Sequence, residues 1–258
     1  MNKTAIDRHR VTIMQMPVDP IRMQDLISSC DQSIRERKSL LLGMVNVAKL
    51  IQSRTNRQLY NSVAGADIIA ADGQGVVILS RLMGQPLPER IAGIDVMNRL
   101  MELADRKEYR VFFLGAKPEI VQKVVHKSAV MFPQLQVAGY RDGYFDLDRQ
   151  GQLVAEQIRD SRADILFVAI TPPKKELFLD RWSDVMGVPV CHGVGGSFDV
   201  FAGRTKRAPA WMQKAGLEWL FRVMQEPRRM WKRYLITNTK FFVLSIGEIA
   251  RARLGLMP

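Results

Sequence analysis

Residues 111–125 read VFFLGAKPEIVQKVV, in which an apolar run, a glycine turn and a helical pattern follow one another. The apolar run 111–114 predicts a buried strand, and Gly115 permits the tight turn that ends it. Pro118 suits the first turn of a helix, and the apolar residues at 120, 121, 124 and 125 give that helix one buried face. The stretch therefore predicts a strand–turn–helix unit.

The same unit recurs along the chain. Further apolar runs occupy residues 41–45, 68–71, 135–138, 165–170 and 188–191. Apolar residues repeat at helical spacing between 94 and 104, which indicates one of the intervening helices. Strands that are apolar throughout are typical of a parallel sheet buried on both sides. We therefore expect an α/β fold, with a mostly parallel sheet and helices on both of its faces.

The formal net charge of +12 is concentrated near the C-terminus. From residue 200 onward, twelve Lys and Arg residues stand against three Asp and Glu residues, a net charge of +9, and aromatic residues lie among them. We predict a core over residues 1–200 and a basic, aromatic-rich helical appendage over 201–258. Such a segment suits an anionic membrane surface. Nucleic acid would also attract it, but no recognition motif is present, and we expect no nucleic-acid partner.

Several other classes are disfavoured by the sequence. The first twenty residues lack the apolar core of a signal peptide, and no run of 18 apolar residues exists, so we expect a soluble or surface-bound protein. His9, His126 and His192 lack the paired spacing of a zinc site. Asp146-Leu147-Asp148 has the spacing of a metal-binding carboxylate pair but follows Gly143-Tyr144-Phe145 in a polar turn, so a solvated turn is favoured. We expect no metal ion.

Ligands of an open parallel sheet bind outside the C-terminal ends of its strands, so the loops there form the candidate site. Asn46 follows the run 41–45 and either bonds a ligand hydroxyl or caps the next helix. Asp72 follows the run 68–71, with Gly73 behind it, and either acts as a general base or caps the next helix.

Two glycine loops follow later strands. Gly115 and Ala116 precede a helix start, where backbone N–H groups and the helix dipole attract phosphate. Residues 192–199 read HGVGGSFD, and Gly195 and Gly196 there allow a nucleotide to lie against the backbone. The pattern differs from the dinucleotide G-x-G-x-x-G, and no acidic residue sits at the matching distance, so a nicotinamide enzyme is disfavoured.

Together these segments resemble the WecG/TagA/CpsF glycosyltransferase family, over about residues 41–234. The residues that carry the resemblance are Asn46; Ala71-Asp72-Gly73 and Gly75; 89–95 (ERIAGID); Phe113-Leu114-Gly115; Gly139 and Gly143-Tyr144-Phe145; Pro173-Lys174-Lys175-Glu176; 193–199 (GVGGSFD); Arg207-Ala208-Pro209; and 216–219 (GLEW), Arg222 and Glu226-Pro227.

The resemblance implies a Rossmann-like core, with a C-terminal appendage that docks on the membrane and closes over the active site. It implies an inverting, metal-independent transfer of a hexose-type sugar from a UDP-sugar to a polyprenyl-diphosphate-linked saccharide, in cell-surface or exopolysaccharide biosynthesis. No cofactor is expected. The enzyme would work at the cytoplasmic face of the inner membrane as a peripheral protein.

Roles for individual residues follow from the resemblance and from the loops described above. The candidate catalytic residues are Asp72, as the base, with Asn46 and Arg90. The candidate donor-binding residues are Gly115, Ala116, Lys175, Gly195, Gly196 and Asp199. For the acceptor diphosphate we select the appendage residues Arg222, Arg229 and Arg233, because a guanidinium can form bidentate hydrogen bonds with phosphate oxygens.

Two positions depart from the family pattern and leave the donor sugar open. Met44 stands where family members often have Thr, and Lys175 where many have Gln. Lys175 either contacts a phosphate or an acidic sugar, or is a solvated residue at a helix start. The alternative function is that of a regulatory protein, which binds a nucleotide sugar without catalysing its transfer. A monomer and a homo-oligomer are equally consistent with the sequence.

Overall fold

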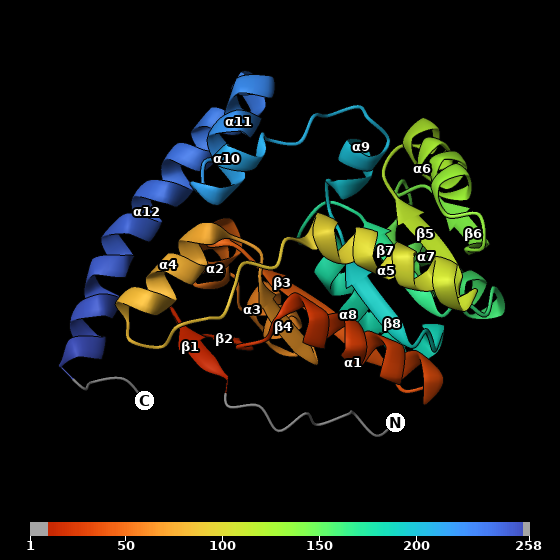
Figure 1. Ribbon diagram of the computed structural model, residues 1–258, viewed down its shortest axis with the longest axis horizontal. Helices are drawn as coiled ribbons and strands as arrows, with labels where there is room; N and C mark the ends of the chain where they lie inside the picture. Colours follow the sequence, from red (N-terminus) through yellow and green to blue (C-terminus); the bar gives the residue numbers. More distant parts are fainter. Residues whose placement is uncertain (1–9, 255–258) are drawn as a thin grey trace.

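The computed structural model describes residues 10–254, except for the side chains of Arg229 and Arg233. Its centre is a sheet in the order β4-β3-β8-β7-β5-β6, in which every neighbouring pair is parallel (Figure 1). The strands are β3 (Leu40–Val45), β4 (Ile68–Ala71), β5 (Arg110–Gly115), β6 (Gln136–Arg141), β7 (Ile165–Ala169) and β8 (Val190–Gly193). The six predicted strands and the α/β fold are confirmed.

Both edges of the sheet show features that the sequence analysis did not predict, although β4 itself is buried throughout, as expected. At one edge β6 is mostly half-buried, because an edge strand has a neighbour on one side only. At the other edge an unpredicted hairpin, β1 (Val11–Ile13) and β2 (Met16–Val18), leads to Asp19. Asp19 binds Ile69 of β4 twice, through its backbone N–H at 2.8 Å and its carboxylate at 2.6 Å. Strands this short carry no readable periodicity.

Helices cover both faces of the sheet, as predicted. One face packs against α1 (Met23–Arg35), α5 (Gly93–Lys107), α6 (Pro118–Met131) and α9 (Ser197–Phe201). The other packs against α2 (Val47–Ser53), α3 (Arg57–Ala64), α4 (Gln74–Leu82), α7 (Leu147–Asp160) and α8 (Lys174–Met186). Successive strand residues face opposite sides, so Phe113 joins the first core and Phe112 the second.

The C-terminal segment consists of α10 (Ala210–Lys214), α11 (Glu218–Gln225) and α12 (Pro227–Arg253). Figure 1 shows α12 along the left side of the molecule, and it contacts α2 and α4 of the core. The segment packs closely, because a Cβ on Gly216 would lie 3.2 Å from Gln74 Cβ. The division into a core and an appendage at residue 200 stays a prediction.

No helix among residues 10–254 combines the length and the apolar character that a bilayer crossing requires. The longest one, α12, has 27 residues and would extend about 40 Å, but charged residues recur along it.

Candidate active site

The strand ends bring the first two candidate residues together. The backbone N–H of Asp72, just after β4, donates to the Val45 carbonyl at the end of β3 (2.8 Å). Asn46 follows Val45, and its side-chain oxygen accepts the Lys49 backbone N–H at 3.1 Å, which caps α2. The capping alternative is therefore correct for Asn46, and the cap uses only its side-chain oxygen.

Asp72 does not cap the helix that follows it. The N-cap of α4 is Gly73, whereas the Asp72 Oδ1 accepts the backbone N–H of Gly93, the first residue of α5, at 3.0 Å. Burial raises the pKa of the Asp72 carboxyl above its usual range, and this effect exceeds the opposing one of the Gly93 hydrogen bond. A carboxylate with a raised pKa is a better match for a general base at neutral pH.

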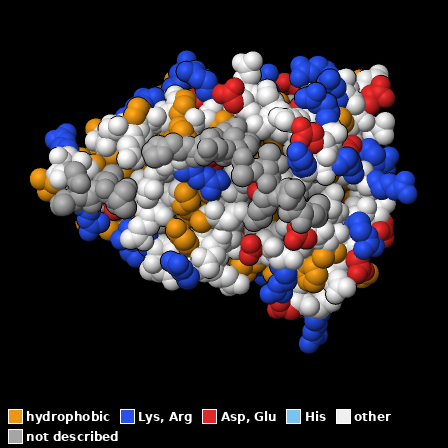
Figure 2. Space-filling model, turned by 90° about the horizontal axis from the view of Figure 1, so that it is seen from below, with side chains coloured by type: hydrophobic (Ala, Val, Ile, Leu, Met, Phe, Trp, Pro, Cys, Tyr) orange, Lys and Arg blue, Asp and Glu red, His pale blue; other side chains and the backbone are white. Residues whose placement is uncertain are grey.

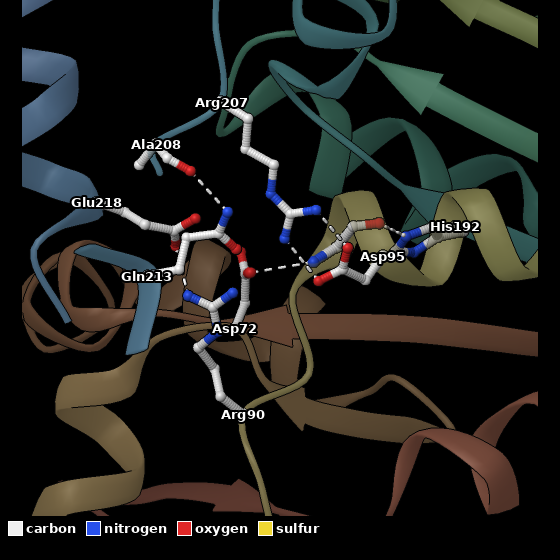
Figure 3. A network of polar contacts seen from close by, with 9 residues as sticks. Asp72, Arg90, Asp95, His192, Arg207, Ala208, Gln213 and Glu218 are labelled. Atoms are coloured by element: carbon white, nitrogen blue, oxygen red, sulfur yellow. Dashed lines mark hydrogen bonds and ion pairs between the residues drawn. The ribbon is translucent and has the colours of Figure 1, made fainter. Parts of the chain in front are cut away.

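Cations surround Asp72 on several sides. The positive charges of Arg222 on α11, Lys49 on α2 and Arg90 oppose the burial effect on the Asp72 pKa. Arg90 is largely buried, and its Nη1 lies 2.6 Å from a carboxylate oxygen of Glu218 at the start of α11 (Figure 3). The predicted neighbours Asp72, Arg90 and Arg222 therefore lie around one point, between the core and the C-terminal helices.

A buried ion cluster lies beneath this point. The Lys49 ammonium is 2.9 Å from Glu176 Oε1 and donates to the Met44 carbonyl at 2.6 Å. The Lys175 ammonium is 3.3 Å from the same Glu176 oxygen and donates to the Gly193 carbonyl at 3.2 Å. Lys175 is only 5 % exposed, so its interpretation as a solvated residue at a helix start is wrong. Two buried cations share one carboxylate.

This arrangement predicts a pH-dependent stability effect of Lys175→Gln. Burial, and next the Lys49 charge, lower the Lys175 pKa to about 8, below the value of about 10.4 in an unfolded chain. Below pH 8, keeping Lys175 charged in the folded wild type therefore lowers its stability by about 3 kcal/mol. This loss of stability disappears as the pH rises toward 10.5. Gln retains a donor for the Gly193 carbonyl. We expect the variant to unfold at a higher temperature than the wild type at pH 7.

Thermal unfolding of both proteins between pH 6.5 and 10 checks this expectation. The advantage of the variant should shrink steadily above pH 8. A difference in unfolding temperature that stays constant over the whole pH range would contradict the conclusion that the buried charge of Lys175 destabilises the wild type. Exposed Lys38→Gln serves as the matched control and should show no such trend.

The glycine loops differ in what they leave open. Gly115 has φ +120°, and a Cβ there would lie 2.5 Å from the Ala169 carbonyl carbon, so only glycine fits. The Ala116 N–H donates to the Ala169 carbonyl at 2.9 Å and is thus already engaged. In contrast, a Cβ on Gly195 or Gly196 would meet nothing within 4 Å. There is space beside both Cα atoms, although the Gly195 N–H already donates to the Val168 carbonyl at 3.4 Å.

The candidate residues for nucleotide binding lie along the same sheet edge but not at one point. β5 is four strands away from β4 in the sheet, so Gly115 is about 19 Å from Asp72 at the usual strand spacing. The loop after β8, with Gly195 and Gly196, lies between them. Asp199, within the α9 helix that follows this loop, forms an ion pair with Arg204 at 3.2 Å, on the segment that leads to α10.

A second polar group joins the C-terminal segment to the core. Arg207 forms a bidentate ion pair with Asp95 of α5, at 2.6 and 2.7 Å (Figure 3). Sequence reasoning assigned no role to Asp95, Glu218, Lys49 or Arg207, although most stand within or beside the segments that carry the family resemblance. Their partners are distant in sequence, so no local pattern identifies the pairs.

The remaining candidates are placed as follows. Arg222 is exposed on α11, whereas the side chains of Arg229 and Arg233, on α12, lie outside the described residues. Asp146 caps α7 by accepting the backbone N–H of Asp148 and Arg149 at 2.9 Å, so the turn ends in a helix cap. Within residues 10–254, no three His, Cys, Asp or Glu side chains form a group that could hold a metal ion.

Comparison with known proteins identifies the family. The model of the glycosyl transferase WecG/TagA/CpsF family matches residues 11–255. The chain belongs to this family. A relative from Bacillus subtilis (strain 168), an N-acetylglucosaminyldiphosphoundecaprenol N-acetyl-beta-D-mannosaminyltransferase, is 36 % identical over 225 residues, 87 % of this chain and 86 % of the relative. A protein of the same name from Bacillus spizizenii is 41 % identical over 173 residues, 67 % of this chain and 66 % of the relative.

The matched range includes the elements that form the candidate site. The family model covers the whole strand-end edge as well as the C-terminal helices that approach it. The resemblance inferred from the sequence is thereby confirmed, and the chain is a glycosyltransferase of this family.

Proposed function

We propose that this protein transfers a hexose-type sugar from a UDP-sugar to a saccharide linked to polyprenyl diphosphate, with inversion and without a metal ion. The observation that carries the proposal is Asp72, a carboxylate with a raised pKa at the strand-end edge, with three cations around it. The names of the relatives support a lipid-diphosphate acceptor that ends in N-acetylglucosamine.

In the proposed reaction, the Asp72 carboxylate takes the proton of the acceptor hydroxyl. The hydroxyl oxygen attacks the anomeric carbon of the donor sugar from the side opposite the diphosphate. The bond between that carbon and the β-phosphate oxygen breaks, and its electron pair leaves with UDP. A single displacement of this kind inverts the anomeric configuration.

Charge that develops on the departing diphosphate needs donors that are already in place. The backbone N–H of Gly196 is one candidate source, whereas that of Gly195 already donates to the Val168 carbonyl at 3.4 Å. Arg90 is another, because its guanidinium has five N–H donors and the Glu218 contact uses only one nitrogen. Arg222 adds positive charge from α11. These groups supply the electrostatic role that a metal ion has in other transferases.

The names of the relatives give N-acetylmannosamine as the sugar they transfer, whereas two residues of this chain leave its own donor sugar open. Met44 and Lys175 lie below Asp72, and Lys175 is held by Glu176 and Gly193 rather than extended toward the strand-end opening. We therefore propose that Lys175 acts on the donor through the shape and charge of the site. N-acetylmannosamine, glucose and a uronic acid all stay candidates.

A donor screen tests the proposal. Purified protein is incubated in EDTA with a synthetic N-acetylglucosaminyl-diphosphate lipid and one labelled UDP-sugar at a time. We expect one donor to label the lipid and to release UDP. Bound UDP without transfer from any donor to any diphosphate-linked acceptor would contradict the proposal and favour a regulatory protein.

The C-terminal helices support a location at the membrane. Trp231, Leu235, Phe242 and Ile246 are exposed, and their spacing places them on one face of α12. Figure 2 shows hydrophobic side chains with Lys and Arg beside them at the left-hand end of the molecule, the side on which Figure 1 draws α12. We propose that this α12 face docks on anionic lipid as a peripheral contact at the cytoplasmic face of the inner membrane.

Combined substitution of Trp231 and Phe242 by serine should weaken binding to vesicles that contain anionic lipid. The two side chains are 53 % and 68 % exposed, so their loss leaves the fold intact while removing apolar area from the contact. We expect binding to fall by about tenfold or more, as measured by vesicle co-sedimentation. Leu153→Ser on α7, 60 % exposed in the wild type, is the matched control and should bind normally. Equal binding by all three proteins would refute docking through α12.

A further inference from the structure

His192 contacts the residue that holds Asp72. It lies within β8 and is fully buried, and its Nε2 is 2.9 Å from the Gly93 carbonyl oxygen (Figure 3). A carbonyl oxygen only accepts hydrogen bonds, so Nε2 carries the proton and donates it. Among the described residues, Nδ1 has no hydrogen-bond partner. The contact joins residues 99 positions apart.

The His192 ring is held neutral by its surroundings. Burial lowers its pKa to about 4, and the charges of Lys175 and Lys49 act in the same direction against the Gly93 hydrogen bond. The ring packs edge-on against Phe167 of β7, with centroids 6.2 Å apart. The donor therefore keeps one protonation state throughout the pH range in which an enzyme works.

Gly93 links this donor to the candidate base. Its N–H binds the Asp72 Oδ1 at 3.0 Å, and its carbonyl accepts from His192. Gly93 begins α5, where the N-cap residue Ala92 has no side-chain cap, so these two contacts fix the start of the helix. A Cβ on Gly93 would lie 3.8 Å from the His192 ring, which shows how closely the two residues approach.

We propose that His192 is a positioning residue, which holds Gly93 so that its N–H keeps the Asp72 carboxylate aimed at the acceptor. The inference rests on the proposed function, since it assigns Asp72 as the base. The competing interpretation is a histidine that merely fills the core. The two differ in one respect, because core filling requires the ring and positioning requires the Nε2 donor.

Two variants separate these interpretations. His192→Phe keeps a ring and removes the donor, whereas His192→Gln places a side-chain N–H near the former Nε2 position. Both variants leave the neighbouring charged residues unchanged. These are Arg90, Arg222 and Lys49 around Asp72, and Lys175 and Lys49 near His192. We expect the Phe variant to lose about tenfold to a hundredfold in kcat with little change in the donor KM. The Gln variant should recover most of this loss.

The pH profile gives a readout that packing alone would not move. The Gly93 N–H lowers the pKa of Asp72, so a loosened Gly93 raises it. The acid limb of kcat/KM should therefore move to higher pH in the Phe variant and return in the Gln variant. An unchanged acid limb and kcat in the Phe variant, with only a lower unfolding temperature, would overturn the inference.

Hydrogen exchange makes the test independent of activity. Exchange of the backbone amides in residues 91–97 should become faster in the Phe variant and normal in the Gln variant. If the Phe variant fails to fold, His192→Asn, which is too short to reach the Gly93 carbonyl, replaces it in every comparison with Gln. Equal exchange and equal kinetics of the Asn and Gln variants would overturn the inference. An inactive wild type would instead overturn the proposed function alone.

Discussion

Asp72→Asn should nearly abolish sugar transfer and leave UDP binding intact. Asn has the same shape and still accepts the Gly93 N–H, so the strand-end geometry survives while the proton acceptor is lost. Removing a general base typically lowers the rate by about a hundredfold to ten-thousandfold. Steady-state transfer at saturating donor gives kcat, and calorimetry with UDP gives the affinity.

The matched control is Asp148→Asn, whose side chain is 81 % exposed on α7. It should transfer sugar at the wild-type rate. The wild type should also lose activity on acidification at a higher pH than an ordinary aspartate would allow, because burial raises the Asp72 pKa and the base must be deprotonated. Activity of the Asp72→Asn variant within about tenfold of wild type would place the base elsewhere.

Glu176→Gln should produce the largest loss of stability. The Glu176 carboxylate is the shared partner of the Lys49 and Lys175 ammonium groups, and all three side chains are buried. Removing one partner of a buried ion pair costs about 3–5 kcal/mol because the remaining charge stays uncompensated. For a chain of this size we expect the unfolding temperature to fall by about 10 °C.

A second substitution identifies the cause of this loss. Adding Lys175→Gln to Glu176→Gln removes one of the two uncompensated cations and should restore part of the stability, a coupling that a double-mutant cycle measures. Glu102→Gln, in an exposed pair with Arg99, should change stability by less than about 1 kcal/mol. Additive effects of the two core substitutions would contradict a shared cluster.

The sheet could be predicted from the sequence because its signal is local. Each buried strand is an apolar run of four to six residues with a glycine or polar loop behind it, and this pattern survives without knowledge of its neighbours. The start of α6 at Pro118 was predictable for the same reason. The β1–β2 hairpin has three-residue strands, which are too short to show a pattern.

The strand-end position of Asp72 was also predictable, since the ends of parallel strands meet at one edge. The residues that set its chemistry were not. Gly93 and His192, and likewise Asp95 and Arg207, meet across about a hundred positions of sequence. Lys175 reads as a helix-start lysine, and only the fold reveals that α8 turns it inward onto Glu176 and the Gly193 carbonyl.

The most direct test of the account is the anomeric configuration of the new glycosidic bond, determined by NMR on product formed in EDTA. A base that activates the acceptor hydroxyl for one displacement predicts inversion, so an α-linked UDP-sugar should give a β-linked product. An α-linked product, or transfer that requires an added divalent metal ion, would contradict the assignment of Asp72 as the base of a metal-independent transferase.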